Sequence, residues 1–252
     1  MIENGFKPMK KWLLMGCVIF TPFFQANALS EDANTKFNLN TVETPSADVG
    51  CAVNNNLVNS AFESVLTVEL INQTVFFHDY SFALLESFPV EFVGNNYNLL
   101  NQNIAKITST LSQINPTFAL QFSVLLTNYL TAGENYVLIL NATSNQNDPG
   151  VIAAFQTWIA NANLIAAFLK QSNSNVNLQS AQTILVSYTN SLAATALNLI
   201  PTPSINPNFV AASALYTEAR SIASDELTLL IIQAITPQEE HLSSKHHHHH
   251  HH

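Results

Sequence analysis

Glycine is scarce in the second part of the chain, and this restricts what the chain can fold into. After residue 53 the only glycines are Gly94, Gly133 and Gly150. Tight β-hairpin turns draw heavily on glycine, so a strand-rich fold has little support. Apolar residues instead recur every three or four positions, which is the spacing of one helix face. The sequence therefore predicts an all-α fold: an antiparallel bundle of about six helices, a pattern that three successive helical hairpins would satisfy.

Prolines and polar loops divide this helical pattern into segments. We expect helices at residues 55–87, 92–113, 117–142, 149–171 and 178–199, and a last one from near Pro207 to just before Pro237. Asp148 can cap the fourth helix, with Pro149 at its first position. The fourth helix is apolar nearly all round, since Trp158 and Ile165 add to its main apolar face, so we expect it to be the central helix.

The N-terminus has the layout of an export signal. Lys7, Lys10 and Lys11 precede a short apolar run, and Ala26-Asn27-Ala28 fits an A-x-A cleavage site. The run is too short to span a membrane, and no later segment is continuously apolar over about 18 residues. We therefore expect residues 1–28 to be a bacterial signal peptide, and the protein to reach the periplasm or the exterior without stable membrane insertion.

Composition sets the remaining boundaries. Residues 29–53 are polar and aperiodic and predict a flexible leader, and residues 54–236 predict the bundle domain. Residues 237–252 form a tail that ends in seven histidines, a purification tag. If Cys17 leaves with the signal peptide, Cys51 has no partner within the chain, which predicts either an inert thiol or an intermolecular contact.

The charge balance excludes one class of partner. Residues 29–240 contain four basic and sixteen acidic residues, a net charge of −12. Affinity for nucleic acids comes mainly from lysine and arginine that displace counterions, so DNA and RNA are excluded as partners. An anionic membrane surface is disfavoured for the same reason.

Two segments resemble a known family. The run FQTWIANANLIAAFL at residues 155–169 is similar to a W-x-x-N-A-D-x-I-A-x-F-L pattern, and LLTNYL at residues 125–130 is similar to L-L-x-x-H-I. Both patterns belong to bacterial helical-bundle proteins of unassigned activity, which the chain resembles over residues 57–235. The resemblance implies a helical-bundle fold.

The resemblance also implies a change of chemistry. Gln73 and Thr74 stand where the family has Glu and His, Asn128 stands in place of a His, and Asn163 in place of an Asp. If the family sites bind a metal or move protons, this chain has lost the ionisable groups. It would then hold a ligand without transferring protons.

The residues themselves offer little for metal or cofactor chemistry. A di-iron bundle needs Glu-x-x-His pairs, and the chain has none. Outside the tag the only histidines are His78 and His241, too few for a zinc site without several carboxylates. We expect no metal and no cofactor. We also expect His78 and Asp79 not to form an orienting pair, because helix neighbours point about 100° apart.

Carboxylates on apolar faces are the best acid–base signal. Glu218 and Asp225 are seven residues apart and share a predicted helix face. Glu226 falls on the predicted apolar stripe of the last helix, and Glu69 and Glu134 lie within apolar stretches. A carboxyl group that is buried there would have a raised pKa and could act as a general acid. The alternative is that these residues lie at the rim of the bundle and keep it soluble.

Aromatic and amide side chains supply the candidate ligand site, since such linings suit small ligands. The candidates are Gln73, Phe77, Tyr80, Asn128, Tyr129, Trp158, Asn161 and Asn163. The alternative is that they are core residues with satisfied amides.

Three functions are compatible with these observations. The first is an exported, non-catalytic protein that binds a small ligand or a protein partner, such as a secreted factor. The second is a periplasmic or secreted hydrolase that uses Glu218 or Asp225 with His78, the weak catalytic candidates. The third is a membrane-active helical bundle.

Overall fold

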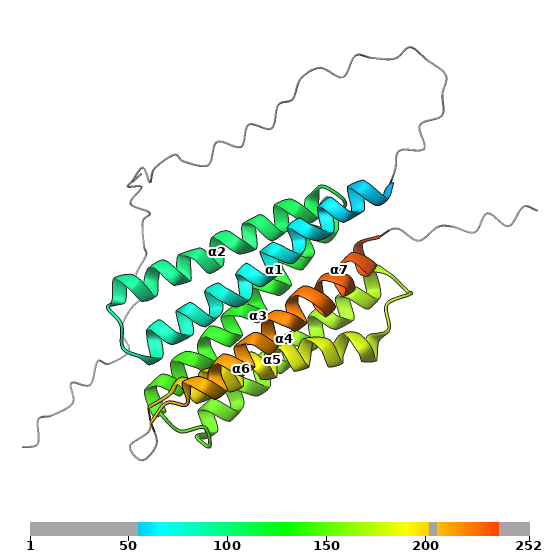
Figure 1. The fold of residues 1–252 in the computed structure, drawn as a ribbon. Coiled ribbons are helices and arrows are strands. Elements are labelled where there is room, and N and C mark those ends of the chain that lie inside the picture. The colour runs from blue at the N-terminus through cyan, green and yellow to red at the C-terminus, as the bar shows by residue number, and fades with distance from the viewer. Residues whose placement is uncertain (1–54, 202–205, 237–252) are drawn as a thin grey trace, which may run out of the picture. The chain divides into compact units, whose positions relative to one another are not determined.

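The computed structural model describes residues 55–201 and 206–236, and these residues are helical with no strand (Figure 1). The helices are α1 (Asn55–Leu85), α2 (Val90–Ser112), α3 (Pro116–Thr143), α4 (Pro149–Ser172), α5 (Leu178–Leu199), α6 (Phe209–Ser221), η1 (Ile222–Leu227) and α7 (Thr228–Ile235). Because α6, η1 and α7 follow one another without a break, the described chain forms six rods. The prediction of an all-α bundle of about six helices is confirmed. The predicted signal peptide, leader, Cys51 and tail lie outside the described residues.

Asparagine and aspartate side chains start most of these helices. Asp148 Oδ1 accepts a hydrogen bond from the Gly150 N–H at 2.8 Å, and Pro149 follows it as predicted. Asn115, Asn177 and Asn208 cap α3, α5 and α6 in the same way. Each cap satisfies one of the free N–H groups in the first turn of its helix. The Asn-rich loops therefore fix where the helices begin.

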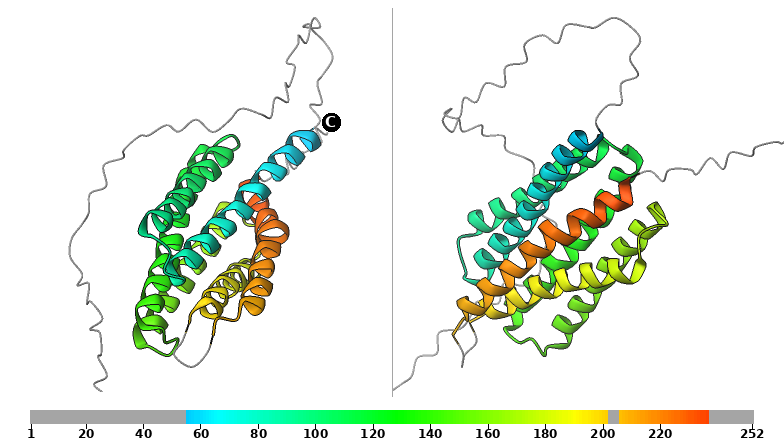
Figure 2. Two further views of the ribbon diagram at one scale, coloured as in Figure 1. Left: turned by 60° about the vertical axis from the view of Figure 1, so that its left-hand side comes forward. Right: turned by 45° about the vertical axis from the view of Figure 1, so that its right-hand side comes forward.

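Consecutive helices pack side by side, most extensively within the pairs α1/α2, α3/α4 and α5/α6, which fits three successive hairpins. The central helix is α1, which packs against α2, α3, α5 and all three segments of the C-terminal rod (Figure 2). The prediction that α4 is central was wrong. Trp158 and Ile165 of α4 are buried, but Ile152 and Leu164 on its outer face are exposed, so its apolar character exceeds what its packing requires.

The helix α4 also has the length and composition of a membrane-crossing segment, and it is the one such helix within residues 55–201 and 206–236. Core helices of proteins outside membranes share these properties, and the side of α4 that carries Trp158 and Ala162 is packed inside the bundle.

The C-terminal rod contains a π-helical turn. At η1 the backbone N–H and the Oγ1 of Thr228 both donate to the carbonyl of Ala223, five residues earlier. A π turn adds a residue and shifts the helix faces that follow. The predicted stripe through Glu226 and Leu229 was therefore wrong, because both are exposed while Leu230 and Ile231 are buried.

Candidate functional site

Five polar side chains on α1, α3 and α5 meet inside the bundle. We call them the buried polar layer: Gln73, Thr74, Tyr129, Tyr188 and Thr189. The Tyr188 hydroxyl lies 2.8 Å from Thr74 Oγ1, and the Tyr129 hydroxyl lies 2.9 Å from Thr189 Oγ1. Each threonine hydroxyl also donates to a carbonyl of its own helix. Because a hydroxyl has one proton, each tyrosine must be the donor to its threonine.

Gln73 is the exception in this layer. Its side chain is only 3% exposed, and neither Nε2 nor Oε1 has a hydrogen-bond partner among the described residues. With Tyr129 and Tyr188 it lines an internal cavity of about 20 Å³. A cavity of about 10–15 Å³ can already hold one water molecule. The buried polar layer therefore has room for a water molecule and is too small for an organic ligand.

Burial keeps the tyrosines of the layer neutral. Desolvation raises the pKa of Tyr188 to about 12, although its hydrogen bond with Thr74 opposes the rise. Desolvation and the neighbouring Tyr188 raise the pKa of Tyr129 well above its usual value. Both hydroxyls are therefore protonated at physiological pH and act as hydrogen-bond donors, with no capacity to serve as a base.

One carboxyl group outside the layer has the raised pKa that the sequence predicted. Glu134 on α3 is buried, and desolvation raises its pKa to about 7. No hydrogen bond or ion pair joins its carboxyl group to another described residue. The other two carboxylates differ: Glu69 accepts a hydrogen bond of 2.7 Å from Asn103 Nδ2, and Glu226 is exposed.

The structure brings together five of the eight predicted ligand residues. Trp158 lies at the centre, with ring centroids 5.2 Å from Phe77 and 5.7 Å from Tyr129. Tyr80 packs against Phe77, and Gln73 lies on the same cavity as Tyr129. The indole Nε1 of Trp158 is buried without a hydrogen-bond partner, although it approaches the Tyr129 hydroxyl.

The three asparagines lie elsewhere. Asn128 is exposed on α3, Asn163 is half-buried on α4, and Asn161 donates to the Thr157 carbonyl of its own helix at 2.9 Å. None of them lines the cavity beside Gln73.

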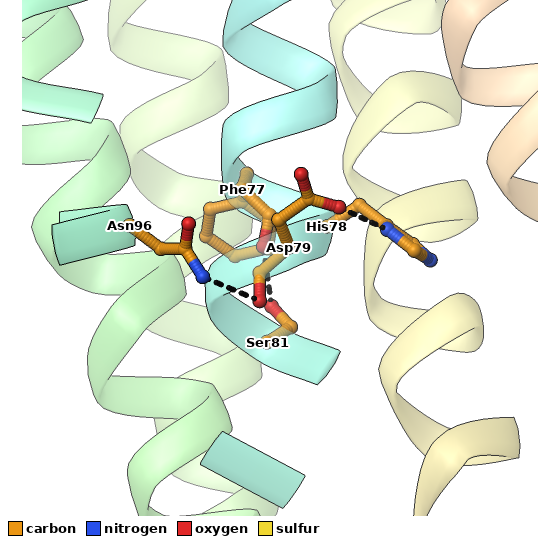
Figure 3. A network of polar contacts seen from close by, with 5 residues as sticks. All are labelled: Phe77, His78, Asp79, Ser81 and Asn96. Carbon is orange, nitrogen blue, oxygen red and sulfur yellow. Dashed lines mark hydrogen bonds and ion pairs between the residues drawn. The ribbon is translucent and has the colours of Figure 1, made fainter. Parts of the chain in front are cut away.

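His78 and Asp79 do form a pair, so the prediction against it was wrong. His78 Nδ1 lies 3.1 Å from Asp79 Oδ1, and Figure 3 shows the carboxylate turned toward the ring. The two Cβ atoms leave the helix in different directions, but both side chains follow the helix surface and their rotamers close the gap. The imidazole also stacks on the Tyr216 ring, with centroids 4.2 Å apart.

The His78 pair does not extend to the predicted catalytic carboxylates. Glu218 is exposed, and Asp225 accepts hydrogen bonds from Ser221 and Ser224 at 3.1 and 2.8 Å. No hydrogen bond or ion pair joins His78 to Glu218 or Asp225 in the described part of the chain. The three residues therefore do not converge on one cavity, which a shared hydrolytic role would require.

Within residues 55–201 and 206–236, no group of three or more His, Cys, Asp or Glu side chains lies close enough to hold a metal ion.

A second cavity has the size of a ligand site. This amide pocket has a volume of about 360 Å³ and opens to solvent between α3, α4 and α5. Its lining residues are Tyr136, Gln146, Asn147, Val151, Ile152, Phe155, Asn190, Ala193, Ala194 and Leu197. Pockets of roughly 300–1,000 Å³ accommodate small organic ligands.

Hydrogen-bonding groups in the amide pocket are unengaged. The side-chain amides of Gln146, Asn147 and Asn190 form no hydrogen bond with other described residues, and Tyr136 and Phe155 pack together below them with centroids 5.9 Å apart. The lining contains no carboxylate, imidazole, thiol or amine. Gln146, Asn147 and Asn190 were not among the residues predicted to form a ligand site. The sequence did predict a ligand site made of amides and aromatic rings, but with Asn128, Asn161 and Asn163 as its asparagines.

Comparison with protein-family models, with curated proteins and with solved structures finds no match for this chain. The resemblance to the bacterial helical-bundle family therefore stays a prediction.

Proposed function

We propose that this protein is an exported, non-catalytic binding protein that takes an uncharged small molecule in the amide pocket. The observation that carries the proposal is the chemistry of the pocket lining: three free side-chain amides around an aromatic and aliphatic floor, with no ionisable group able to transfer a proton near neutral pH. Burial raises the pKa of Tyr136, so its hydroxyl stays protonated at neutral pH.

The lining also defines the ligand. An ion would lose its hydration shell in the pocket without meeting an opposite charge. Hydrogen bonds from neutral amides do not offset the free energy of that desolvation. An uncharged molecule with one apolar side and two or three carbonyl, amide or hydroxyl groups satisfies both parts of the lining. The apolar side would lie on Phe155 and Leu197, and its polar groups would bond to Asn190 and Gln146.

The test is a thermal-shift screen of uncharged small molecules against the full chain, with two variants. Ala194→Phe fills the pocket, whereas Ala167→Phe places the same ring on the exposed face of α4. A ligand at about 100 times its Kd stabilises the folded state by about 2.7 kcal/mol. We expect hits to stabilise the wild type and the Ala167 variant but not the Ala194 variant. Hits that stabilise all three equally would refute the proposal, as would chemical conversion of a hit by the wild type.

A further inference from the structure

The C-terminal end of α1, the start of α2 and the start of α6 lie close together (Figure 1). Most of the apolar side chains at this place are exposed. We call these side chains the phenylalanine patch: Phe82, Phe88, Val90, Phe92, Phe209 and Val210. Phe82 lies at its centre, with ring centroids 5.7 Å from Phe88 and 6.4 Å from Phe209. Phe92 extends the patch from Phe88 at 5.4 Å. The rings join two parts of the chain that are distant in sequence, residues 82–92 and Phe209.

Five of the six side chains of the patch are exposed to solvent. Val90 and Val210 are 76% and 83% exposed, and Phe88, Phe92 and Phe209 keep between 42% and 50% of their surface in solvent. Scattered single apolar residues on a surface are ordinary, but a contiguous aromatic patch marks an interaction site. Phenylalanine also belongs to the residue types that are enriched at the centres of protein interfaces.

Two glutamates flank the patch in sequence. Glu86 is the first residue of the turn between α1 and α2, and Glu91 lies between Val90 and Phe92. On the other side of Phe82, its ring stacks with the imidazole of His78, which is paired with Asp79. The described chain has three basic residues, Lys106, Lys170 and Arg220, and none of them occurs in residues 78–97 or 206–216. Glu86 is half-buried and Glu91 is exposed, and an exposed carboxylate can accept a hydrogen bond from an ammonium or guanidinium group.

We propose that the phenylalanine patch is a docking site for a basic, apolar segment of another protein. The apolar side chains of that segment would cover Phe88, Phe92 and Phe209. Its lysine or arginine side chains would reach Glu86 and Glu91, and they would also gain from cation–π contact with the exposed rings. Acidic charge at the patch selects against anionic lipid surfaces, because they carry the same sign of charge. The site is separate from the amide pocket, since the two share no lining residue.

The experiment measures binding of a fluorescent 14-residue amphipathic helix of leucine and lysine to the full chain by anisotropy. A second peptide has every lysine replaced by glutamate. We expect the lysine peptide to bind, the glutamate peptide to bind at least 10-fold more weakly, and the affinity of the lysine peptide to fall as salt rises, because the contacts are ionic. Failure of the lysine peptide to bind, or equal binding of both peptides, would overturn the proposal.

Variants then locate the site. Phe92→Ser and the double change Glu86→Gln with Glu91→Gln should each weaken binding of the lysine peptide 5-fold or more, on the order of the 1 kcal/mol that marks an interface residue. The matched controls Leu120→Ser on α3 and Glu63→Gln on α1 remove exposed residues of the same kinds elsewhere and should leave binding unchanged. Equal losses in the controls would show that the peptide follows net charge alone and would overturn the proposal.

Two further measurements test whether the Phe92 variant is folded and whether the patch binds lipid instead of peptide. Circular dichroism melts show whether the Phe92 variant is folded, and Phe209→Ser on α6 replaces it if it is not. Phosphatidylcholine vesicles serve as the alternative target: wild-type binding to the vesicles that Phe92→Ser abolishes, without binding of the lysine peptide, would assign the patch to a lipid surface instead. The variant Ala194→Phe, whose amide pocket is filled, should bind the lysine peptide as the wild type does. The peptide test therefore does not depend on whether the ligand screen finds a hit.

Discussion

Gly133 on α3 lies directly against the indole of Trp158 on α4. A Cβ atom added at Gly133 would be 2.6 Å from Trp158 Cζ2 and 3.0 Å from Phe77 Cε2. Both neighbours are rings that are themselves packed in the core, so neither can move aside easily. The absence of a side chain at Gly133 is what allows the Trp158 ring to be fully buried between α3 and α1.

The change Gly133→Ala should therefore destabilise the protein. Alanine is the better helix former, but overpacking a core costs about 1–3 kcal/mol, which outweighs that gain. The matched control is Gly94→Ala in α2, where nothing lies within 4 Å of the added Cβ. That change should stabilise the fold by about 0.5–1 kcal/mol. Urea unfolding followed by circular dichroism measures both, and a stabilised Gly133 variant would contradict the packing described here.

Removing Tyr188 or Thr74 from their hydrogen bond should destabilise the protein by different amounts. In Tyr188→Phe, Thr74 still donates to the Leu70 carbonyl, so the loss is one hydrogen bond of about 1 kcal/mol. In Thr74→Val, the buried Tyr188 hydroxyl is left without an acceptor, which costs about 1–3 kcal/mol. The double variant should cost less than the sum of the two. Additive losses in a double-mutant cycle would show that the two hydroxyls do not interact.

Replacement of Gln73 by an apolar residue should stabilise the protein. The amide of Gln73 is buried with no hydrogen-bond partner among the described residues, so Gln73→Met keeps the length of the side chain and removes the desolvated polar atoms. We expect the free energy of unfolding to rise by about 1 kcal/mol or more, since an unsatisfied buried amide costs about 1–3 kcal/mol. Differential scanning calorimetry would detect the higher Tm. A loss of more than about 1 kcal/mol would mean that the amide has partners, such as an internal water.

Because Glu134 is buried, we expect the folded protein to become less stable as pH rises. Burial raises the folded-state pKa of Glu134 to about 7 from the model-peptide value of 4.5. Between these two values the folded protein binds more protons than the unfolded chain, so its stability decreases as pH rises. The contribution is fully present below pH 4.5 and is lost by about pH 7. Because Glu134 is not wholly enclosed, we expect a loss of about 1–3 kcal/mol. Glu134→Gln should remove this slope from urea titrations between pH 4.5 and 7.5, and an unchanged slope would assign it to other groups.

The sequence predicted the helices well because their boundaries are local. Prolines, aspartate and asparagine caps act within one turn, and Asp148 with Pro149 behaves as its residue types require. Trp158, Tyr129 and Phe77 were predicted as ligand residues, with core packing as the alternative, and all three are buried.

The site was predicted less well because it depends on long-range register. The π turn at η1 shifts the last helix by one position, and no local pattern announced it. Asn128 and Asn163 were candidate ligand residues and Asn190 was not, because helix packing, which the sequence does not show, decides which amide faces a pocket. The His78–Asp79 contact depends on rotamers, which residue spacing does not fix.

The proposed binding function is tested most directly by mapping amide chemical shifts in ¹⁵N-labelled protein as an uncharged hit from the thermal-shift screen is added. We predict that the shifts concentrate at Val151, Asn190, Ala194 and Leu197 around the amide pocket. They should also weaken in Asn190→Asp, which adds a charge without filling the pocket, and persist in the control Asn128→Asp. Shifts centred on Gln73 or His78, or unchanged affinity in the Asn190 variant, would contradict the account.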